Sequence, residues 1–139
     1  MALNTQFSIA VHVLAGLGYR GERGSTTSEL ATSVNTSPSF VRRVVAKLSK
    51  AGLVRTATGP AGSCHLARQP GEITLLDVYR AVDAPKAFAI HAYPAEKFCP
   101  VSCNIKVALE SVLDKTQRSM ETGLRKITLA EVIHDVKCQ

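Results

Sequence analysis

Residues 25–52 read "STTSELATSVNTSPSFVRRVVAKLSKAG", and this stretch holds the signals that decide the fold. Thr26 precedes Glu29 by three positions, which is the spacing of a capping box at a helix N-terminus. In that arrangement each side chain accepts a hydrogen bond from a backbone amide that the helix leaves without a partner. The spacing predicts a short helix over about 27–34, followed by a turn at 35–37.

A second helix start follows at Ser37 and Pro38, an N-cap residue and a first-turn proline. The pattern predicts a helix that continues to Gly52, because glycine is typical of a helix end. One arc of this helix carries the apolar residues Phe40, Val41, Val44, Val45 and Leu48. The opposite arc carries Ser39, Arg42, Arg43, Ala46, Lys47 and Lys50. A short helix, a turn and a helix with a basic outer face form the helix-turn-helix arrangement.

The segment after this helix predicts a β-hairpin. Residues 53–57 have the β-branched character of a strand, and 59–62 read Gly-Pro-Ala-Gly, which is typical of a turn. Residues 63–67 can then pair back on the first strand. A hairpin that directly follows the second helix of a helix-turn-helix is a wing, so residues 1–70 are expected to form a winged helix-turn-helix domain.

The N-terminal run FSIAVHVLAGLGY predicts the first core helix, over about 5–17. Its apolar residues recur at helical spacing, and three glycines are expected to end it: Gly16, Gly18 and Gly21. No basic residue precedes the run and His12 interrupts it, so it differs from a secretory signal peptide. No stretch of the chain is long enough to span a membrane, and we expect a cytoplasmic protein.

Residues 71–98 predict one helix and a connecting loop. Thr74 and Asp77 form a second capping box, which starts a helix within 73–83. Residues 84–98 contain two prolines and show no helical period, so we expect them to form a loop.

Residues 99–139 predict a long helix and a short last helix. From Pro100 onward, apolar residues recur at helical spacing over about 20–25 residues. So small a chain cannot cover all of this apolar stripe, and a second copy paired through residues 100–125 would bury it. Thr128 and Glu131 form a third capping box. The predicted fold class is mainly α with a small β-hairpin wing, a winged helix-turn-helix domain followed by a long C-terminal dimerisation helix.

The positive charge of the chain lies in its first half. The formal net charge is +6, and residues 1–70 hold eight Lys and Arg against Glu22 and Glu29, whereas residues 71–139 hold nine of each sign. This asymmetry indicates that the N-terminal part binds a polyanion. For a winged helix-turn-helix domain the expected polyanion is double-stranded DNA. No Ser/His/Asp grouping, carboxylate pair or phosphate-cradling motif is present, so the sequence does not favour an enzyme.

The order of these motifs resembles a known family. The helix-turn-helix, LSKAGLV, the Gly-Pro-x-Gly wing, ITLLDVYRAVD, a cysteine-bearing loop, a long helix and ITLAEVI follow one another along nearly the whole chain. This is similar to the Rrf-two (Rrf2) family of bacterial transcription regulators, the relatives of IscR, NsrR and CymR, and within it to the YwnA-like branch. The resemblance implies a homodimer held by the long helix, which presents two winged domains to a near-palindromic operator, and it favours a repressor.

The resemblance also implies a set of DNA-contacting residues. The major-groove helix would present Ser37, Ser39, Arg42, Arg43 and Lys47, and the wing tip would comprise Gly59, Pro60, Ala61 and Gly62. Many members carry Arg immediately before the wing turn, whereas Thr58 stands there in this chain and Arg55 lies three positions earlier. A minor-groove arginine at the wing tip is therefore not carried over.

The residue types agree with a DNA contact. Arg42 and Arg43 can read guanine edges or bind phosphates, and Lys47 and Lys50 suit phosphates. At the start of the first helix of the motif, Thr26, Thr27 and Ser28 either contact a phosphate or only cap the helix.

Two cysteines in FCPVSC, Cys99 and Cys103, leave several roles open. Cluster-binding members of the family place three cysteines in this loop, roughly six apart, and only Cys103 matches one of them. A [2Fe–2S] cluster needs four protein ligands, mostly thiolate, and a zinc site from Cys99, Cys103 and His91 has weak spacing. The sequence therefore favours no cofactor, and leaves a thiol switch or simple packing.

Cys64, in the second strand of the wing, is a further redox candidate, although the pattern favours a strand residue that faces the core. The alternative to a DNA-binding regulator is a small thiol-redox or metal-binding protein, or a sensor whose DNA binding depends on a [2Fe–2S] cluster.

Overall fold

The helix-turn-helix lies where the sequence predicts it. In the computed structural model, which describes residues 4–57 and 62–139, α2 spans Thr27–Val34 and α3 spans Pro38–Lys50. Thr26 Oγ1 accepts a hydrogen bond from the Glu29 amide at 3.1 Å, and the side chain of Ser37 caps α3 in the same way. Asn35 ends α2 with a left-handed φ of 62°, a conformation that asparagine tolerates better than most residues. Both predicted caps are confirmed.

The first helix is longer than the sequence predicts. α1 spans Gln6–Arg20 and passes through Gly16 and Gly18, so the expected end near Leu17 is wrong. At Gly18 the bare backbone lies against Ile133 of the last helix, where a Cβ atom would overlap the isoleucine side chain. This glycine permits close helix packing rather than ending the helix. Gly21, with a φ of 64°, is the residue that ends it.

The wing is part of a three-stranded antiparallel sheet. β2 (Val54–Thr56) and β3 (Ser63–Leu66) form the predicted hairpin. A short 3₁₀ turn, η1 (Gly21–Arg23), leads into β1 (Ser25–Thr26), which pairs with the other side of β3 and gives the strand order β1-β3-β2. The sequence does not predict β1, because two residues are too few to show an alternating pattern.

The core lies where α1, α2, α3 and the sheet meet. Its largest fully buried side chains are Leu14, Leu17, Leu30, Leu48, Leu53, Ile73 and Leu129. Two of these come from the C-terminal half: Ile73 precedes α4 (Leu75–Ala81), and Leu129 begins α6 (Leu129–Lys137). The sequence-based division groups the last helix with the long one, whereas in the structure α6 packs on α1 and completes the core of the winged domain.

α4 and α6 start side by side on matching sequence, Ile73-Thr74-Leu75 and Ile127-Thr128-Leu129. The amide of Leu75 donates to the carbonyl of Ile127 at 2.9 Å, and the amide of Leu129 donates to the carbonyl of Ile73 at 2.8 Å. We call this pair of segments the joint. The capping boxes predicted at Thr74 and Thr128 are both formed, and a 3₁₀ turn, η2 (Pro70–Glu72), precedes the joint.

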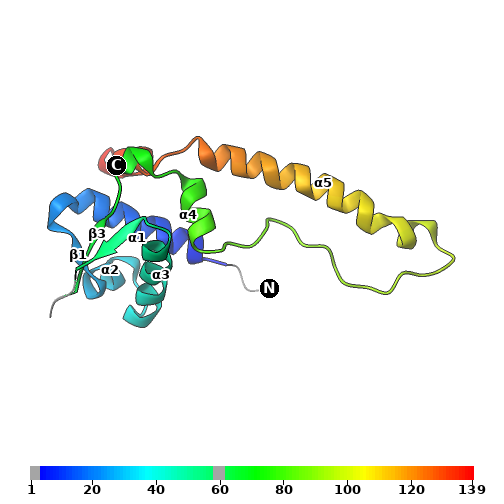
Figure 1. The fold of residues 1–139 in the computed structure, drawn as a ribbon, viewed down its shortest axis with the longest axis horizontal. Coiled ribbons are helices and arrows are strands. Elements are labelled where there is room, and N and C mark those ends of the chain that lie inside the picture. Colours follow the sequence, from blue (N-terminus) through cyan, green and yellow to red (C-terminus); the bar gives the residue numbers. More distant parts are fainter. Residues whose placement is uncertain (1–3, 58–61) are drawn as a thin grey trace.

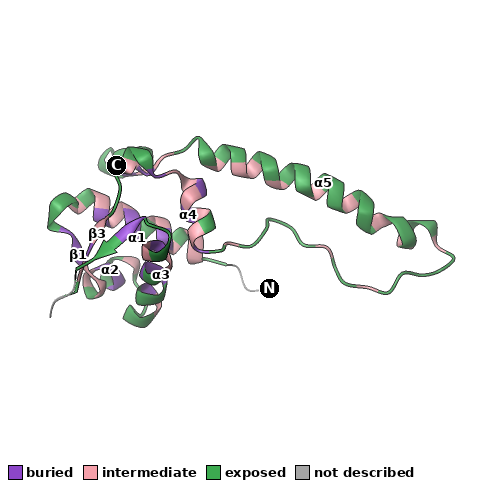
Figure 2. Cartoon of the chain, viewed as in Figure 1, coloured by how far each residue is buried: buried purple, intermediate pink, exposed green. Residues whose placement is uncertain are grey.

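The linker 83–98 runs outward from α4, and the long helix α5 (Pro100–Arg125) returns beside it to the winged domain (Figure 1). We call α5 and the linker the arm. None of the residues of α5 is buried, as Figure 2 shows by the absence of purple along it. Gln117 donates to Tyr79 Oη at 3.0 Å and accepts from the Ala87 amide at 3.0 Å, which fastens α5 to α4 and to the linker.

The predicted fold class is confirmed, since the chain is mostly helical, with a small sheet and a long C-terminal helix. Among the residues that the structure describes, no helix combines the length and the apolar character needed to cross a membrane.

Candidate nucleic-acid interface

α3 presents an apolar face to the core and a basic face to solvent. Val41, Val44, Val45 and Leu48 are buried, and these are four of the five residues on the arc that the sequence assigns to the core. On the outer side, the structure exposes Ser37, Ser39, Arg42, Arg43 and Lys50. The guanidinium carbon of Arg43 lies 5.1 Å from the centroid of the Phe40 ring, a cation–π contact that orients this side chain along the helix.

Lys47 differs from the other cations of α3. It is half-buried, and its Nζ donates to Oε1 of Gln6 in α1 at 2.8 Å. The contact joins two helices that are adjacent in the core. Lys47 therefore carries its charge close to the basic face while it also holds α3 against α1.

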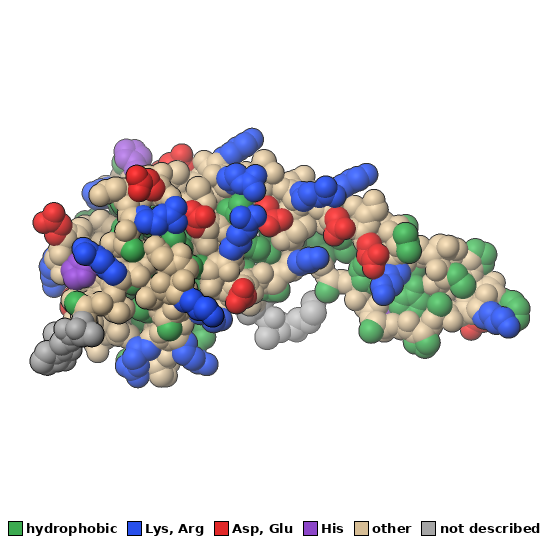
Figure 3. Space-filling view, viewed as in Figure 1, with side chains coloured by type: hydrophobic (Ala, Val, Ile, Leu, Met, Phe, Trp, Pro, Cys, Tyr) green, Lys and Arg blue, Asp and Glu red, His purple; other side chains and the backbone are tan. Residues whose placement is uncertain are grey.

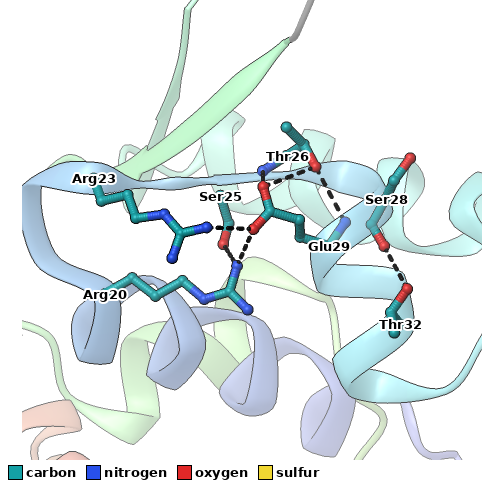
Figure 4. Close-up of polar contacts among 7 residues, drawn as sticks. All are labelled: Arg20, Arg23, Ser25, Thr26, Ser28, Glu29 and Thr32. Atoms are coloured by element: carbon teal, nitrogen blue, oxygen red, sulfur yellow. Dashed lines mark hydrogen bonds and ion pairs between the residues drawn. The ribbon is translucent and has the colours of Figure 1, made fainter.

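The start of α2 is the centre of a polar network (Figure 4). Oε2 of Glu29 accepts from Arg20 Nη1 at 2.6 Å and from Arg23 Nη2 at 3.2 Å. Arg20 Nη1 also donates to the hydroxyl of Ser25, whose side chain is buried in the core sheet. This network fastens the helix-turn-helix to the end of α1 and to β1.

Glu29 is held in its ionised form. The Thr26 backbone amide donates to its carboxylate and lowers the pKa of Glu29, burial opposes this shift, and the nearby Arg20 and Arg23 guanidinium groups lower the pKa further. Two guanidinium groups thus share the single negative charge of Glu29, and Arg23 stays largely exposed. Part of the basic excess of the N-terminal half is paired within the fold, and the cations for which the described residues provide no ion pair lie on α3 and the wing.

Between α3 and the hairpin lies an open cleft of about 600 Å³. Its residues come from α2, α3 and the hairpin: Thr27, Arg42, Val45, Ala46, Ser49, Lys50, Thr56, Gly62 and Cys64. Two cations and three hydroxyl groups lie beside a mainly apolar lining, and these polar groups suit a sugar–phosphate backbone. Figure 3 shows blue Lys and Arg side chains around the end of the winged domain that carries α3.

The structure describes only part of the predicted wing contacts. Arg55 is exposed on β2, opposite His65 of β3. Gly62 is exposed, has a φ of 51°, and lines the cleft. Thr58, Gly59, Pro60 and Ala61 lie outside the described residues.

At the start of α2 the structure shows the predicted capping role for Thr26 alone, and the phosphate contact stays a prediction. Thr26 is engaged as the cap, and Ser28 accepts through its carbonyl from Thr32 Oγ1 at 3.0 Å, which leaves its hydroxyl exposed. Thr27 lines the cleft. Sequence reasoning missed Gln6 and Arg20 as positioning residues, because their partners lie 41 and nine positions away.

Cys99 and Cys103 lie at the outer end of α5. Cys99 is the N-cap residue, and its Sγ accepts from the Ser102 amide at 3.3 Å. Cys103 donates from its Sγ to the carbonyl of Glu96 at 3.3 Å. The two thiols are free, the first is half-buried and the second is exposed.

Cys64 behaves as a core residue. Its side chain belongs to the hydrophobic core, and burial raises the pKa of the Cys64 thiol, with a smaller opposing effect from the Thr27 side chain. A thiol with a raised pKa is a poor nucleophile near neutral pH. This environment favours the packing role over the redox role.

The third candidate metal ligand, His91, stacks on Tyr93 with ring centroids 4.7 Å apart. Across residues 4–57 and 62–139, no three side chains of His, Cys, Asp or Glu converge in a way that could hold a metal ion.

In sequence, the chain matches one protein family and several individual relatives. Residues 3–135 match the family described as Rrf2, Iron-dependent Transcriptional regulator. YwnA of Bacillus subtilis (strain 168), named as an HTH-type transcriptional regulator, is 35% identical over 133 residues, which covers 95% of this chain and 97% of YwnA. Protein aau3 of Rhizobium meliloti (strain 1021) is 34% identical over 116 residues, or 82% of this chain and 75% of aau3.

Solved structures share the fold over almost the whole chain. IscR of T. potens superposes with a TM-score of 0.72 at 24% identity and covers 98% of this chain and 88% of its own. A structure described as a transcriptional regulator from Lactobacillus plantarum has a TM-score of 0.83 at 22% identity, with coverage of 97% and 91%. These two likenesses show the fold alone.

Proposed function

Because this chain belongs to the Rrf2 family of transcriptional regulators, we propose that it binds a near-palindromic operator in double-stranded DNA as a homodimer and represses the adjoining genes. Its relatives are regulators and not enzymes, and this chain is likewise not an enzyme. The observation that carries the proposal is the outer face of α3, where Arg42, Arg43 and Lys50 are exposed opposite a fully apolar inner face.

The cations of this face are expected to contact different parts of the DNA. Arg42 lies on the cleft side of α3 and can form two parallel hydrogen bonds to a guanine edge. Lys50, at the end of α3, contributes a point charge that suits a phosphate. The cleft between α3 and the wing would seat the phosphate backbone that borders the major groove, since Thr27, Ser49 and Thr56 supply hydroxyl groups there.

The homodimer is supported by the exposed side of α5. Val101 and Val112 are 68% and 55% exposed, and no residue of this 26-residue helix is buried within one chain. Apolar surface of this extent is typical of an interface. A dimer bound to a palindrome excludes other proteins from the same DNA, and this exclusion is the simplest route to repression. A protein with this role would act in the cytoplasm, where the bacterial chromosome lies.

Cysteine chemistry at the tip of the arm is the proposed means of modulation. Cys99 caps α5 through its sulfur, which accepts a hydrogen bond from the Ser102 amide. Oxidation of Cys99 or Cys103 would disturb this first turn. A shift of the long helix would then alter the spacing of the two winged domains on the operator.

The iron named in the family description does not fit the residues present. A [2Fe–2S] cluster takes four protein ligands, and the only two neighbouring cysteines are engaged with backbone groups of Glu96 and Ser102. His91 is stacked on Tyr93 and adds no third donor beside them. We therefore place no step of the function on iron, and the cluster-dependent sensor remains the alternative that a spectrum of protein purified without oxygen would support.

Selection of bound sequences from random duplex DNA tests the proposal. We expect a near-palindromic consensus and a steep loss of affinity with salt, because released counterions favour binding at low ionic strength. A flat salt dependence with no enriched sequence would reject DNA binding. Placing the selected operator between a promoter and a reporter then separates repression from activation.

A further inference from the structure

A second pocket, of about 280 Å³, lies between the linker and α5, and none of its described residues belongs to the cleft of the winged domain. We call it the arm pocket. The residues that α5 contributes to it are Lys106, Glu110, Leu113, Asp114 and Gln117. At about 100° per residue, their mean direction lies about 140° from Val112, so the pocket faces away from the exposed Val101 and Val112. Pairing of two chains through these valines does not require the pocket to be covered.

The two walls of the arm pocket are joined at both ends. At the inner end, Gln117 of α5 accepts from the Ala87 amide at 3.0 Å. Near the tip of the arm, the hydroxyl of Ser102 accepts from the Glu96 amide at 2.8 Å. Between these ends, residues 88–92 form no hydrogen bond with any part of the chain that the structure describes. The linker wall therefore has backbone groups that a ligand can bind.

Part of the lining of the arm pocket is apolar. Phe88 and Ile90 of the linker and Leu113 of α5 supply it, and Phe88 is 62% exposed. A ligand that covers this aromatic ring removes apolar surface from water, which favours binding. The pocket volume is at the lower end of the range for small-molecule sites, about 300–1,000 Å³, which restricts the ligand to a small metabolite.

Four charged side chains border the apolar part, two of each sign: Lys86, Lys106, Glu110 and Asp114. None of them forms an ion pair with another described residue. Lys106 and Glu110 lie four residues apart on α5, in the order that is less favourable for pairing with each other. A ligand with one charge of each sign can pair with two of these groups, whereas a simple anion or cation would also meet a group of like charge.

We propose that the arm pocket binds a free α-amino acid with an apolar side chain. The carboxylate of the ligand pairs with Lys106, and its ammonium group pairs with Glu110. Side chains four residues apart on a helix have Cβ atoms about 5–6 Å apart, which suits two charged groups that share one α-carbon. The apolar side chain of the ligand covers Phe88 and Leu113.

Binding would fasten the unpaired part of the linker to α5. The linker follows α4 directly, and the joint anchors the other end of α5 to the winged domain, so the ligand would stiffen the arm that carries the proposed regulation. This consequence for DNA binding rests on the proposed function, whereas binding of the amino acid itself does not.

Titration of the full chain with L-phenylalanine, followed by NMR chemical shifts, tests the site. We expect saturable shifts at residues 86–90 and 106–117, with an affinity in the millimolar range or tighter for so small a ligand. Phenethylamine lacks the carboxylate and phenylpropionate lacks the ammonium group, and each should bind about fivefold more weakly, the effect of losing one exposed ion pair. Glycine, which has no side chain to cover Phe88, should also bind more weakly than L-phenylalanine.

Variants of α5 identify the groups that hold the ligand. Lys106→Ala and Glu110→Gln should each weaken binding of L-phenylalanine by about fivefold. Lys115→Ala is the matched control, because Lys115 is exposed on α5 and does not line the pocket. This variant should bind L-phenylalanine as the native chain does.

The outcomes separate this site from the proposed function. Shifts that do not saturate, or that are confined to α3 and the wing, would overturn the site. Equal binding of L-phenylalanine and of either analogue that lacks a charge would overturn the amino-acid assignment. Operator affinity is measured separately with and without L-phenylalanine, and a change supports regulation through the arm. A chain that binds L-phenylalanine but no DNA would confirm the site and reject only the proposed function.

Discussion

Lys47 of α3 and Gln6 of α1 are joined side chain to side chain, with the ammonium group donating to the amide oxygen at 2.8 Å. This contact links α1 to the helix that carries the basic face, in addition to the buried side chains that hold α3 in the core. It also gives two neighbouring lysines on one helix different roles, since Lys50 is exposed and has no such partner among the described residues.

Gln6→Ala is expected to destabilise the fold by about 1 kcal/mol, because it leaves a half-buried ammonium group without its acceptor. Lys47→Ala should cost a similar amount, and Lys50→Ala should stay within about 0.5 kcal/mol of the native chain. Urea unfolding at neutral pH measures all three. If Lys50→Ala were as costly as Lys47→Ala, the Gln6 contact would have no energetic weight.

Arg42→Ala is expected to weaken binding to the selected operator more than Lys50→Ala does, by about 1–3 kcal/mol if it removes a two-bond contact to guanine. Lys50→Ala should lower affinity for operator and random DNA to the same degree and reduce the salt slope by about one phosphate. Titrations with both DNAs at several salt concentrations provide the comparison. Equal losses on both DNAs for Arg42→Ala would assign it to the backbone.

Glu29→Gln is expected to lower stability at neutral pH and to have little effect in acid. The pKa of Glu29 is lowered in the folded chain, chiefly by the Thr26 amide, so its ionised form stabilises the fold above the ordinary glutamate value of about 4.3. This contribution is lost as the pH falls through the lowered folded pKa. Thermal unfolding of both chains from pH 7 to pH 2 should show the two midpoints converging. A gap that persists at the acid end would mean that packing, not charge, explains the loss.

Gly24→Ala is expected to be more damaging than Gly52→Ala, although both positions have a positive φ, 68° and 79°. A Cβ atom at Gly24 would lie 2.6 Å from the backbone oxygen of Cys64 in β3, whereas nothing lies within 4 Å of one at Gly52. Gly52→Ala should therefore cost only the conformational strain, about 1 kcal/mol, and Gly24→Ala should cost clearly more. Denaturant midpoints decide the order, and equal losses would contradict close packing of η1 on the wing.

The thiols are expected to react in two classes. Cys103 and Cys138 are exposed and should be labelled quickly by an aromatic disulfide reagent, with Cys99 close behind. Cys64 should be labelled only as fast as the fold opens, because burial raises its pKa and shields it. Mass spectrometry of the labelled chain over time assigns each site. Rapid labelling of Cys64 in the folded chain would restore it as a redox candidate.

Helix starts could be predicted because a cap is a local signal. Thr26 and Glu29 lie three positions apart, and the structure forms their capping box as expected. The sequence also predicts α3, because the apolar arc in its sequence is the face that the structure buries. The end of α1 could not be predicted in the same way. Gly18 lies within the helix and packs against Ile133, which is far along the chain.

The sequence predicts the exposed cations of the candidate interface, but it does not predict the residues that pair with or position the other cations. Arg42, Arg43 and Lys50 are exposed on α3 as the sequence analysis expects. That Arg20 is neutralised by Glu29 could not be foreseen, because it requires the end of α1 and the start of α2 to meet in space. Charge counts locate an interface, whereas pairing within the fold decides which charges remain for it.

The joint at Ile73 and Ile127 makes the arm a lever. Two backbone hydrogen bonds, from Leu75 and from Leu129, anchor the end of α5 to a winged domain whose core includes the next helix. Over the length of α5, about 39 Å, a rotation of about 5° at the joint displaces the outer end by about 3 Å. The converse follows from the same geometry: if α5 and the winged domain turn about the joint as rigid bodies, a displacement of a few ångströms at the Cys99 end tilts α3 by a few degrees.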